Sequence, residues 1–152
     1  MRISAKADYA VRAAVELAAA GGGPVKGDAI ARAQSISPRF LENILGELRH
    51  AGLVRSQRGS EGGYWLARDA SEISIAEVIR AVEGPLASVR GERPEHLEYA
   101  GTAQPLREVW IATRASLRTV VEQVTLADVA AGRLPEHVTA LAADPDAQSA
   151  RR

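Results

Sequence analysis

Cysteine is absent from this 152-residue sequence, and its absence removes several kinds of chemistry. Without thiols the chain forms no disulfide, has no cysteine nucleophile or thiol redox sensor, and binds no iron–sulfur cluster through cysteine. The three histidines, His50, His96 and His137, are far apart and lack the spacing of metal ligands. We therefore expect no metal site and no cofactor.

Long apolar runs are also missing. No stretch approaches the roughly 20 apolar residues that a membrane-spanning helix needs. The first twenty residues carry Arg2, Lys6, Asp8, Arg12 and Glu16, which interrupt the apolar segment that a signal peptide requires. We expect a cytoplasmic protein with no membrane partner.

Catalytic patterns are missing as well. The sequence shows no nucleophile–base set, and its glycine-rich stretch at 59–63 is too short for a phosphate-binding loop and does not precede a helix. We expect that the protein is not an enzyme.

The net charge of zero conceals an uneven distribution. Residues 1–68 hold ten Lys or Arg against six Asp or Glu, whereas residues 69–152 hold nine against thirteen. A polyanion such as DNA would be attracted to the first part. Chance scatter of surface charge remains an alternative.

The first part of the chain is predicted to form a helix–turn–helix. Ser4 is a candidate N-cap for an alanine-rich helix that the Gly-Gly-Gly-Pro run at 21–24 ends. A short helix over 28–33 follows. Ser37 then caps a third helix, with Pro38 at its first position.

A hairpin and a fourth helix are predicted next. Residues 53–58 alternate like a strand, 59–63 supply glycines for the tip, and 64–66 form the return strand. The Ser74–Glu77 pattern is a capping box that begins a helix over 75–83. The helix–turn–helix and the hairpin together predict a winged helix–turn–helix.

The second part is predicted to hold a long helix. Residues 86–104 have no clear period and favour an extended connection, with room for one helical turn. Pro105 then opens a helix with apolar residues every three or four positions, and a short helix starts near Thr125. The composition beyond Pro135 predicts disorder in the last ten or so residues.

The fold class predicted is therefore mainly α with a small β-hairpin. We divide the chain into a winged helix–turn–helix DNA-binding domain (1–84), a connection that is a possible effector region (85–104), a dimerisation helix with a short return helix (105–134), and a disordered tail (135–152). The predicted core consists of Leu17, Ile30, Ile36, Phe40, Leu41, Leu45, Leu48, Leu66, Ile75, Val78 and Ile79.

In a helix–turn–helix, the start of the second helix meets the base edges. The candidate base-contacting residues are Ser37, Arg39, Glu42 and Asn43. Arginine prefers guanine, asparagine prefers adenine, and glutamate accepts from the cytosine amino group. Glu42 would lower affinity wherever no donor meets it, which gives specificity. A solvated surface charge is an equally open interpretation of Glu42.

The hairpin carries Arg55 and Arg58, and Arg58 lies beside its flexible tip. A narrow minor groove attracts an arginine delivered in this way. Ser4, Lys6 and Arg49 are candidate phosphate contacts, which position a protein on DNA without reading its sequence. An ordinary hairpin with solvated arginines is the alternative.

The long helix needs a partner for its apolar stripe. The stripe consists of Leu106, Val109, Trp110, Thr113, Leu117, Val120, Val121 and Val124. Burying such side chains contributes roughly 1.5–3 kcal/mol each, so we expect a second copy of the chain to cover them. Packing of this helix on its own winged domain is the alternative. Trp65 either packs or joins Tyr99 and His96 around a planar ligand.

Several segments together resemble the Rrf2 family of bacterial winged helix–turn–helix regulators. They are MRISAKADYAVRA, ISPRFLENILGELRHAGLVRSQRG, EGGYWLAR, ISIAEVIRAVEGPL and VTLADVAAGRL, in order over about residues 1–134. The resemblance implies a homodimer on partly palindromic promoter DNA. It also implies that Glu42 discriminates bases, that Arg58 enters the minor groove, and that 105–124 forms the dimer interface.

The chain departs from this family in one important region. Well-known members hold an iron–sulfur cluster through cysteines after the segment matched by EGPL, where this sequence has none. Asp8 also stands where many members carry a basic residue. We therefore expect a homodimeric repressor that binds double-stranded DNA without a cluster, with a small-molecule effector, a partner protein or no effector. A winged-helix module that binds protein or RNA is the alternative.

Overall fold

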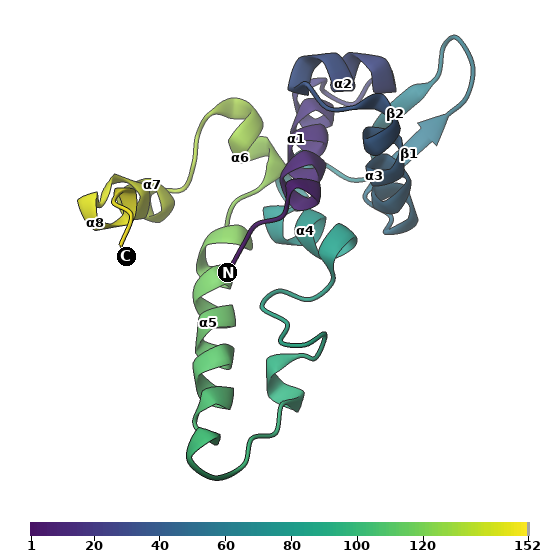
Figure 1. Ribbon diagram of the computed structural model, residues 1–152. Coiled ribbons are helices and arrows are strands. Elements are labelled where there is room, and N and C mark those ends of the chain that lie inside the picture. Colours follow the sequence, from purple (N-terminus) through teal and green to yellow (C-terminus); the bar gives the residue numbers. More distant parts are fainter. Residues whose placement is uncertain (152) are drawn as a thin grey trace.

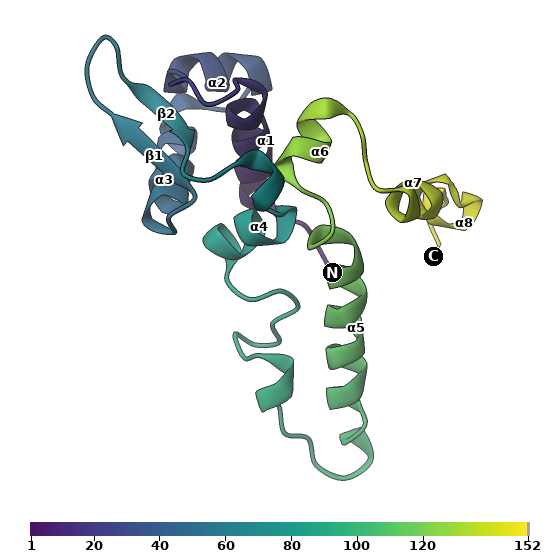
Figure 2. The same cartoon turned by 180° about the vertical axis from the view of Figure 1, so that it is seen from behind.

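A winged unit and a long helical arm make up the computed structural model, which describes residues 1–151 (Figure 1). In chain order the elements are α1 (Ala5–Ala19), α2 (Gly27–Gln34), α3 (Pro38–His50), β1 (Val54–Gln57), β2 (Gly63–Leu66), η1 (Ala70–Glu72), α4 (Ile75–Glu83), η2 (Pro94–His96), η3 (Gly101–Ala103), α5 (Leu106–Val121), α6 (Leu126–Ala131), α7 (Glu136–Ala143) and α8 (Pro145–Gln148). Helix α5 extends away from the winged unit, and α7 and α8 lie to one side (Figure 2). The predicted fold class, mainly α with a β-hairpin, is confirmed.

The helix–turn–helix consists of α2 and α3. Ser35 ends α2 in the left-handed conformation, with φ of 54°, and so turns the chain into α3. Pro38 occupies the first turn of α3, as expected. The predicted cap is wrong in one respect, because the Ser37 side chain makes no capping hydrogen bond. The Ser4 side chain does cap α1, by accepting from the Ala7 N–H at 3.0 Å.

The wing is the antiparallel pair β1–β2, in which Val54 lies opposite Leu66. A short bridge attaches it to the α1–α2 connection, where Val25 and Tyr64 exchange two backbone hydrogen bonds of 2.8 Å. Gly63 permits this approach, because a Cβ there would lie 2.7 Å from the Val25 carbonyl oxygen. The base of the wing is therefore fixed to the helix–turn–helix.

The capping box of α4 forms as predicted. Ser74 Oγ accepts from the Glu77 N–H at 3.2 Å, and the Glu77 carboxylate accepts from the Ser74 N–H at 3.0 Å. Partial burial acts to raise the pKa of Glu77. The hydrogen bonds from Arg68 and from the Ser74 backbone outweigh that effect and hold this pKa below its ordinary value.

The core lies between α1, α2, α3 and α4. Most of the predicted members are buried, but Phe40 is wrong: its side chain is 40% exposed and meets the Tyr9 ring edge-on at 5.7 Å. Leu66, Ile75 and Ile79 are half-buried. The predicted core lacked several buried residues, namely Ala10, Ala13, Ala14, Ile44, Leu53, Val54, Ile73 and Leu126.

The chain returns to the winged unit after α5. Leu126 is fully buried in the winged core, and its N–H donates to the Ile73 carbonyl at 2.9 Å. Val124, predicted to lie in the dimer interface, is only 5% exposed, and its carbonyl accepts from the Ile75 N–H at 2.9 Å. Helix α5 ends at Val121, so Val124 lies beyond the long helix in which the sequence placed it.

The connection between α4 and α5 contains two 3-10 turns, η2 and η3, and a tight turn near Val89. Ala87 and Arg90 both adopt positive φ, of 53° and 52°. The segment is therefore more ordered than the extended connection predicted.

The tail also differs from the prediction of disorder over 135–152. Helices α7 and α8 occupy most of it, and α7 is held to α5 by a 2.8 Å hydrogen bond between the His137 ring and the Thr119 carbonyl. Arg152 lies outside the described residues. No helix within residues 1–151 is both long and apolar enough to span a bilayer.

Candidate nucleic-acid interface

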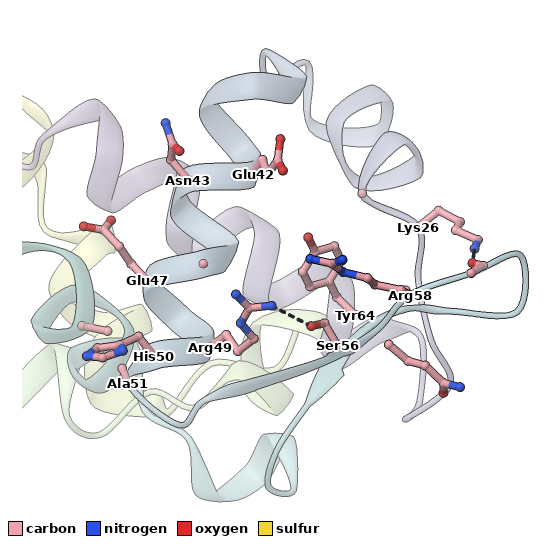
Figure 3. A pocket seen from close by; sticks show the side chains of 16 residues that line it. Lys26, Glu42, Asn43, Glu47, Arg49, His50, Ala51, Ser56, Arg58 and Tyr64 are labelled. Atoms are coloured by element: carbon pink, nitrogen blue, oxygen red, sulfur yellow. Dashed lines mark hydrogen bonds between the residues drawn. The ribbon is translucent and has the colours of Figure 1, made fainter.

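An open groove separates α3 from the wing (Figure 3). Its walls come from residues far apart in the sequence: α3 forms one side, the wing the other, and the start of α2 closes one end. The lining side chains include Lys26, Glu42, Asn43, Glu47, Arg49, His50, Ser56, Gln57, Arg58 and Tyr64. The groove therefore combines the predicted reading helix with the predicted wing.

The four candidate base contacts all lie in exposed positions on or just before the first half of α3. Glu42 and Asn43 line the groove, and Figure 3 shows both side chains projecting from the helix. Ser37 and Arg39 lie at the helix start, outside the groove lining. The start of α3 thus exposes four polar side chains, with the ring of Phe40 among them.

The two wing arginines lie on different surfaces. Arg58 lines the groove, and Figure 3 shows its side chain directed toward Tyr64 rather than past the wing tip. Arg55 lies opposite Trp65 in the strand register, and both line a second depression, which adjoins the groove and shares Arg49 and Ser56 with it. Strand alternation explains the separation, since Ser56 and its register partner Tyr64 face the groove.

Two basic side chains connect the wing to the helix–turn–helix by hydrogen bonds. Arg49 on α3 donates to the Ser56 hydroxyl at 3.1 Å. Lys26, at the N-cap of α2, donates to the Gly59 carbonyl at 2.8 Å. Lys26 gives no signal in the sequence, because its partner lies 33 residues away and no local pattern connects them.

Ser4 and Lys6, predicted to contact phosphates, already have partners within the chain. The Lys6 ammonium pairs with the Glu47 carboxylate at 2.8 Å, and both side chains are partly exposed. The Ser4 hydroxyl donates to the Glu83 carboxylate and caps α1. Neither lines the groove between α3 and the wing.

The predicted dimer face is partly exposed. The Val109 and Leu106 side chains are 48% and 38% exposed, while Thr113, Leu117, Val120 and Val121 are half-buried. Trp110 is half-buried, and its indole N–H donates to the Tyr99 hydroxyl at 2.8 Å within the same chain.

Trp65, Tyr99 and His96 do not form one site. Trp65 lines the depression beside Arg55, whereas Tyr99 and His96 line a different hollow with Arg107. The structure therefore does not assemble the planar-ligand site that the sequence left open.

The donor chemistry does not fit an iron centre. The chain has no cysteine, and residues 1–151 bring together no group of three or more His, Asp or Glu side chains suited to a metal. The hollow beyond the end of α4 is lined by four arginines, namely Arg80, Arg93, Arg114 and Arg118, and by only two carboxylates, Glu95 and Glu122. A guanidinium is always protonated and has no lone pair to offer a metal.

Comparison with known proteins gives a family match over most of the chain. The family model described as "Rrf2: Iron-dependent Transcriptional regulator" matches residues 3–132. The protein named "Putative HTH-type transcriptional regulator Rv1287" of Mycobacterium tuberculosis H37Rv is 58% identical over 153 aligned positions, which cover 100% of this chain and 95% of that protein. The HTH-type transcriptional regulator CymR of Bacillus subtilis is 38% identical over 131 positions, covering 86% of this chain and 90% of that protein.

Solved structures agree with the sequence matches. The structure of CymR, the global cysteine regulator of B. subtilis, superposes with a TM-score of 0.73 at 35% identity and covers 87% of this chain and 98% of that one. IscR from T. potens superposes with a TM-score of 0.69 at 33% identity and covers 100% and 94%. These similar proteins are DNA-binding transcriptional regulators, not enzymes.

Proposed function

The chain belongs to the Rrf2 family of transcriptional regulators, and we propose that it acts as a homodimeric repressor that reads its operator with the groove between α3 and the wing. The observation that supports this most is the joint lining of that groove by Glu42 and Asn43 of α3 and by Arg58 of the wing. A helix fills a major groove while an adjacent arginine reaches the minor groove.

We assign base reading to the exposed start of α3. Asn43 offers the amide that pairs with adenine, Arg39 the fork that pairs with guanine, and Glu42 an acceptor for cytosine. Glu42 has no ion pair among residues 1–151, so desolvating it against phosphates is costly unless a base donor meets it. That cost supports a role in specificity rather than in affinity.

We assign the positioning of the duplex to the cations around the groove. Lys26 and Arg49 each use one donor on the wing and keep further donors for phosphate oxygens. Arg58 is exposed beside the wing tip and supplies the minor-groove contact. We assign Arg55 to a contact with the DNA backbone beside the operator, because it lies on the other face of the hairpin.

We propose that α5 pairs with the same helix of a second copy. Leu106 and Val109 expose apolar surface along an arm that stands clear of the winged unit (Figures 1 and 2). A two-fold pairing covers both copies with one self-complementary surface. It also presents two copies of the unit formed by α3 and the wing, which we call the reading head, to a partly palindromic site. Such a dimer on a promoter blocks polymerase without any further contact.

We propose that regulation does not pass through an iron–sulfur cluster, although the family description is iron-dependent. The absence of cysteine and the arginine lining of the region after α4 support this proposal. Because its partner is DNA, we expect the protein to act in the cytoplasm.

Selection of bound fragments from genomic DNA, followed by anisotropy titrations, tests the function. We expect a recurring, partly palindromic sequence whose affinity falls steeply with salt as counterions are released from the phosphates. Two results would contradict this assignment and favour the protein- or RNA-binding alternative. One is equal affinity for all duplexes, and the other is stronger competition by RNA than by DNA of the same length.

A further inference from the structure

A second hollow lies on the far side of α4 from the wing, between the end of α4, the connection that follows it, and α5. Four arginines line it, namely Arg80, Arg93, Arg114 and Arg118, together with the carboxylates Glu95 and Glu122. We propose that this arginine hollow binds a small polyanion, a molecule with two or more carboxylate or phosphate groups.

The charges in the arginine hollow do not cancel. Arg114, whose side chain is only 13% exposed, pairs with Glu95, and Arg80 pairs with Glu122 at 2.7 Å. Arg118 reaches the same Glu122 oxygen only at 3.7 Å, which is too long for a hydrogen bond. Arg93 is exposed and has no ion pair within residues 1–151.

The guanidinium groups of Arg93 and Arg118 therefore keep most of their hydrogen-bond donors available on the rim of one cavity. Guanidinium forks bind carboxylate and phosphate oxygens in pairs, which gives both strength and geometric selectivity. The hollow has a volume of about 500 Å³, within the range of small-molecule sites. Its lining is mostly charged, so the ligand is a hydrophilic anion and not an apolar molecule.

The arginine hollow lies at the joint between the winged unit and the arm. The connection is fixed to α5, because Arg107 donates to the Glu95 carbonyl at 2.7 Å and Trp110 donates to Tyr99 at 2.8 Å. The Arg80–Glu122 pair is the ion pair that joins α4 to α5 across the hollow. An anion that engages Arg80 and Arg118 competes with Glu122 for them and so shifts the arm relative to the reading head.

That shift would change the separation of the two reading heads in a dimer. The effect on DNA rests on the proposed function, whereas anion binding itself does not. The two are therefore measured separately, with binding first recorded in the absence of DNA.

Titration calorimetry of the full chain with citrate and with inorganic pyrophosphate, at constant ionic strength, tests the site. We expect saturable binding of at least one of these anions. The double variant Arg93→Gln/Arg118→Gln should bind at least about tenfold more weakly, because each charge-assisted hydrogen bond contributes more than a neutral one. Neither residue makes a short ion pair, so the variant keeps the fold's contacts.

The matched control is Arg32→Gln/Arg133→Gln, which removes the same charge from exposed positions outside the hollow. It should bind both anions as the unaltered chain does. No saturable binding, or equal weakening in the two double variants, would overturn the site. Anion binding that leaves operator affinity unchanged would overturn the coupling but leave the site standing.

Discussion

Arg58 carries the proposed minor-groove contact. It is exposed beside the wing tip and lines the groove with Glu42 and Asn43. We predict that Arg58→Ala weakens operator binding by about 1–3 kcal/mol, as measured by anisotropy at fixed salt. The control Arg133→Ala, at an exposed position outside the groove, should have little effect. Equal operator affinity for Arg58→Ala and the unaltered chain would refute the wing assignment.

Gly62 controls the shape of the wing through steric contact. A Cβ at this position would collide with the backbone of Gln57 and Arg58, whereas a Cβ at Gly46 in α3 meets nothing within 4 Å. We predict that Gly62→Ala lowers the free energy of unfolding by about 1–3 kcal/mol. Gly46→Ala should raise it by about 0.5–1 kcal/mol, because alanine favours a helix interior.

Thermal unfolding followed by circular dichroism measures both glycine substitutions. A Gly62→Ala variant as stable as the unaltered chain would mean that the wing backbone adjusts freely. The wing would then not be a rigid wall of the groove.

Helices α4 and α3 each begin after a serine, but only one of the two serine side chains caps its helix. Ser74 makes the capping hydrogen bonds of α4, whereas the Ser37 side chain makes none for α3. We predict that Ser74→Ala lowers the free energy of unfolding by about 1 kcal/mol. Ser37→Ala should change it by less than about 0.5 kcal/mol. Urea titrations give both values, and comparable losses in the two variants would contradict the difference in capping.

Local signals predicted the elements well, and long-range contacts explain what was missed. The bounds of α4 follow from adjacent residues, a capping box at its start and Gly84 at its end, so the sequence predicted them closely. Leu126 enters the core only because the chain returns after α5, which no local period reveals. Phe40 fits the apolar stripe of α3 but lies at its margin against Tyr9.

The candidate site was predictable in part for the same reason. The position of Glu42 and Asn43 on α3 follows from the helix period, whereas the contact of Lys26 with the wing depends on tertiary structure. The division of Arg55 and Arg58 between two faces needed the strand register. The arginine hollow combines three segments that show nothing unusual separately.

Helix α5 is the proposed interface between two copies of the chain. Val109 is the most exposed large apolar residue of α5, and a charge there would be buried without a partner in a dimer. In sedimentation velocity at micromolar concentration, the unaltered chain should have twice the 16.1 kDa chain mass. Val109→Glu should sediment at 16.1 kDa.

The control for this experiment is Ala33→Glu, an exposed position on α2 in the winged unit. It should remain dimeric. A monomer for the unaltered chain, or a dimer that Val109→Glu leaves intact, would show that α5 is not the interface.

In the proposed complex, the two wings of a dimer meet one duplex beside their reading helices. The chain has no cysteine, so Ser60→Cys at the wing tip is a unique attachment point for an iron chelate that cleaves nearby DNA. We predict two symmetrical clusters of minor-groove cleavage flanking half-sites whose centres lie about 34 Å, or a multiple of that distance, apart. The same reagent on Ala140→Cys in α7 should give no such pattern. Absence of cleavage from Ser60→Cys on a bound operator would contradict the account.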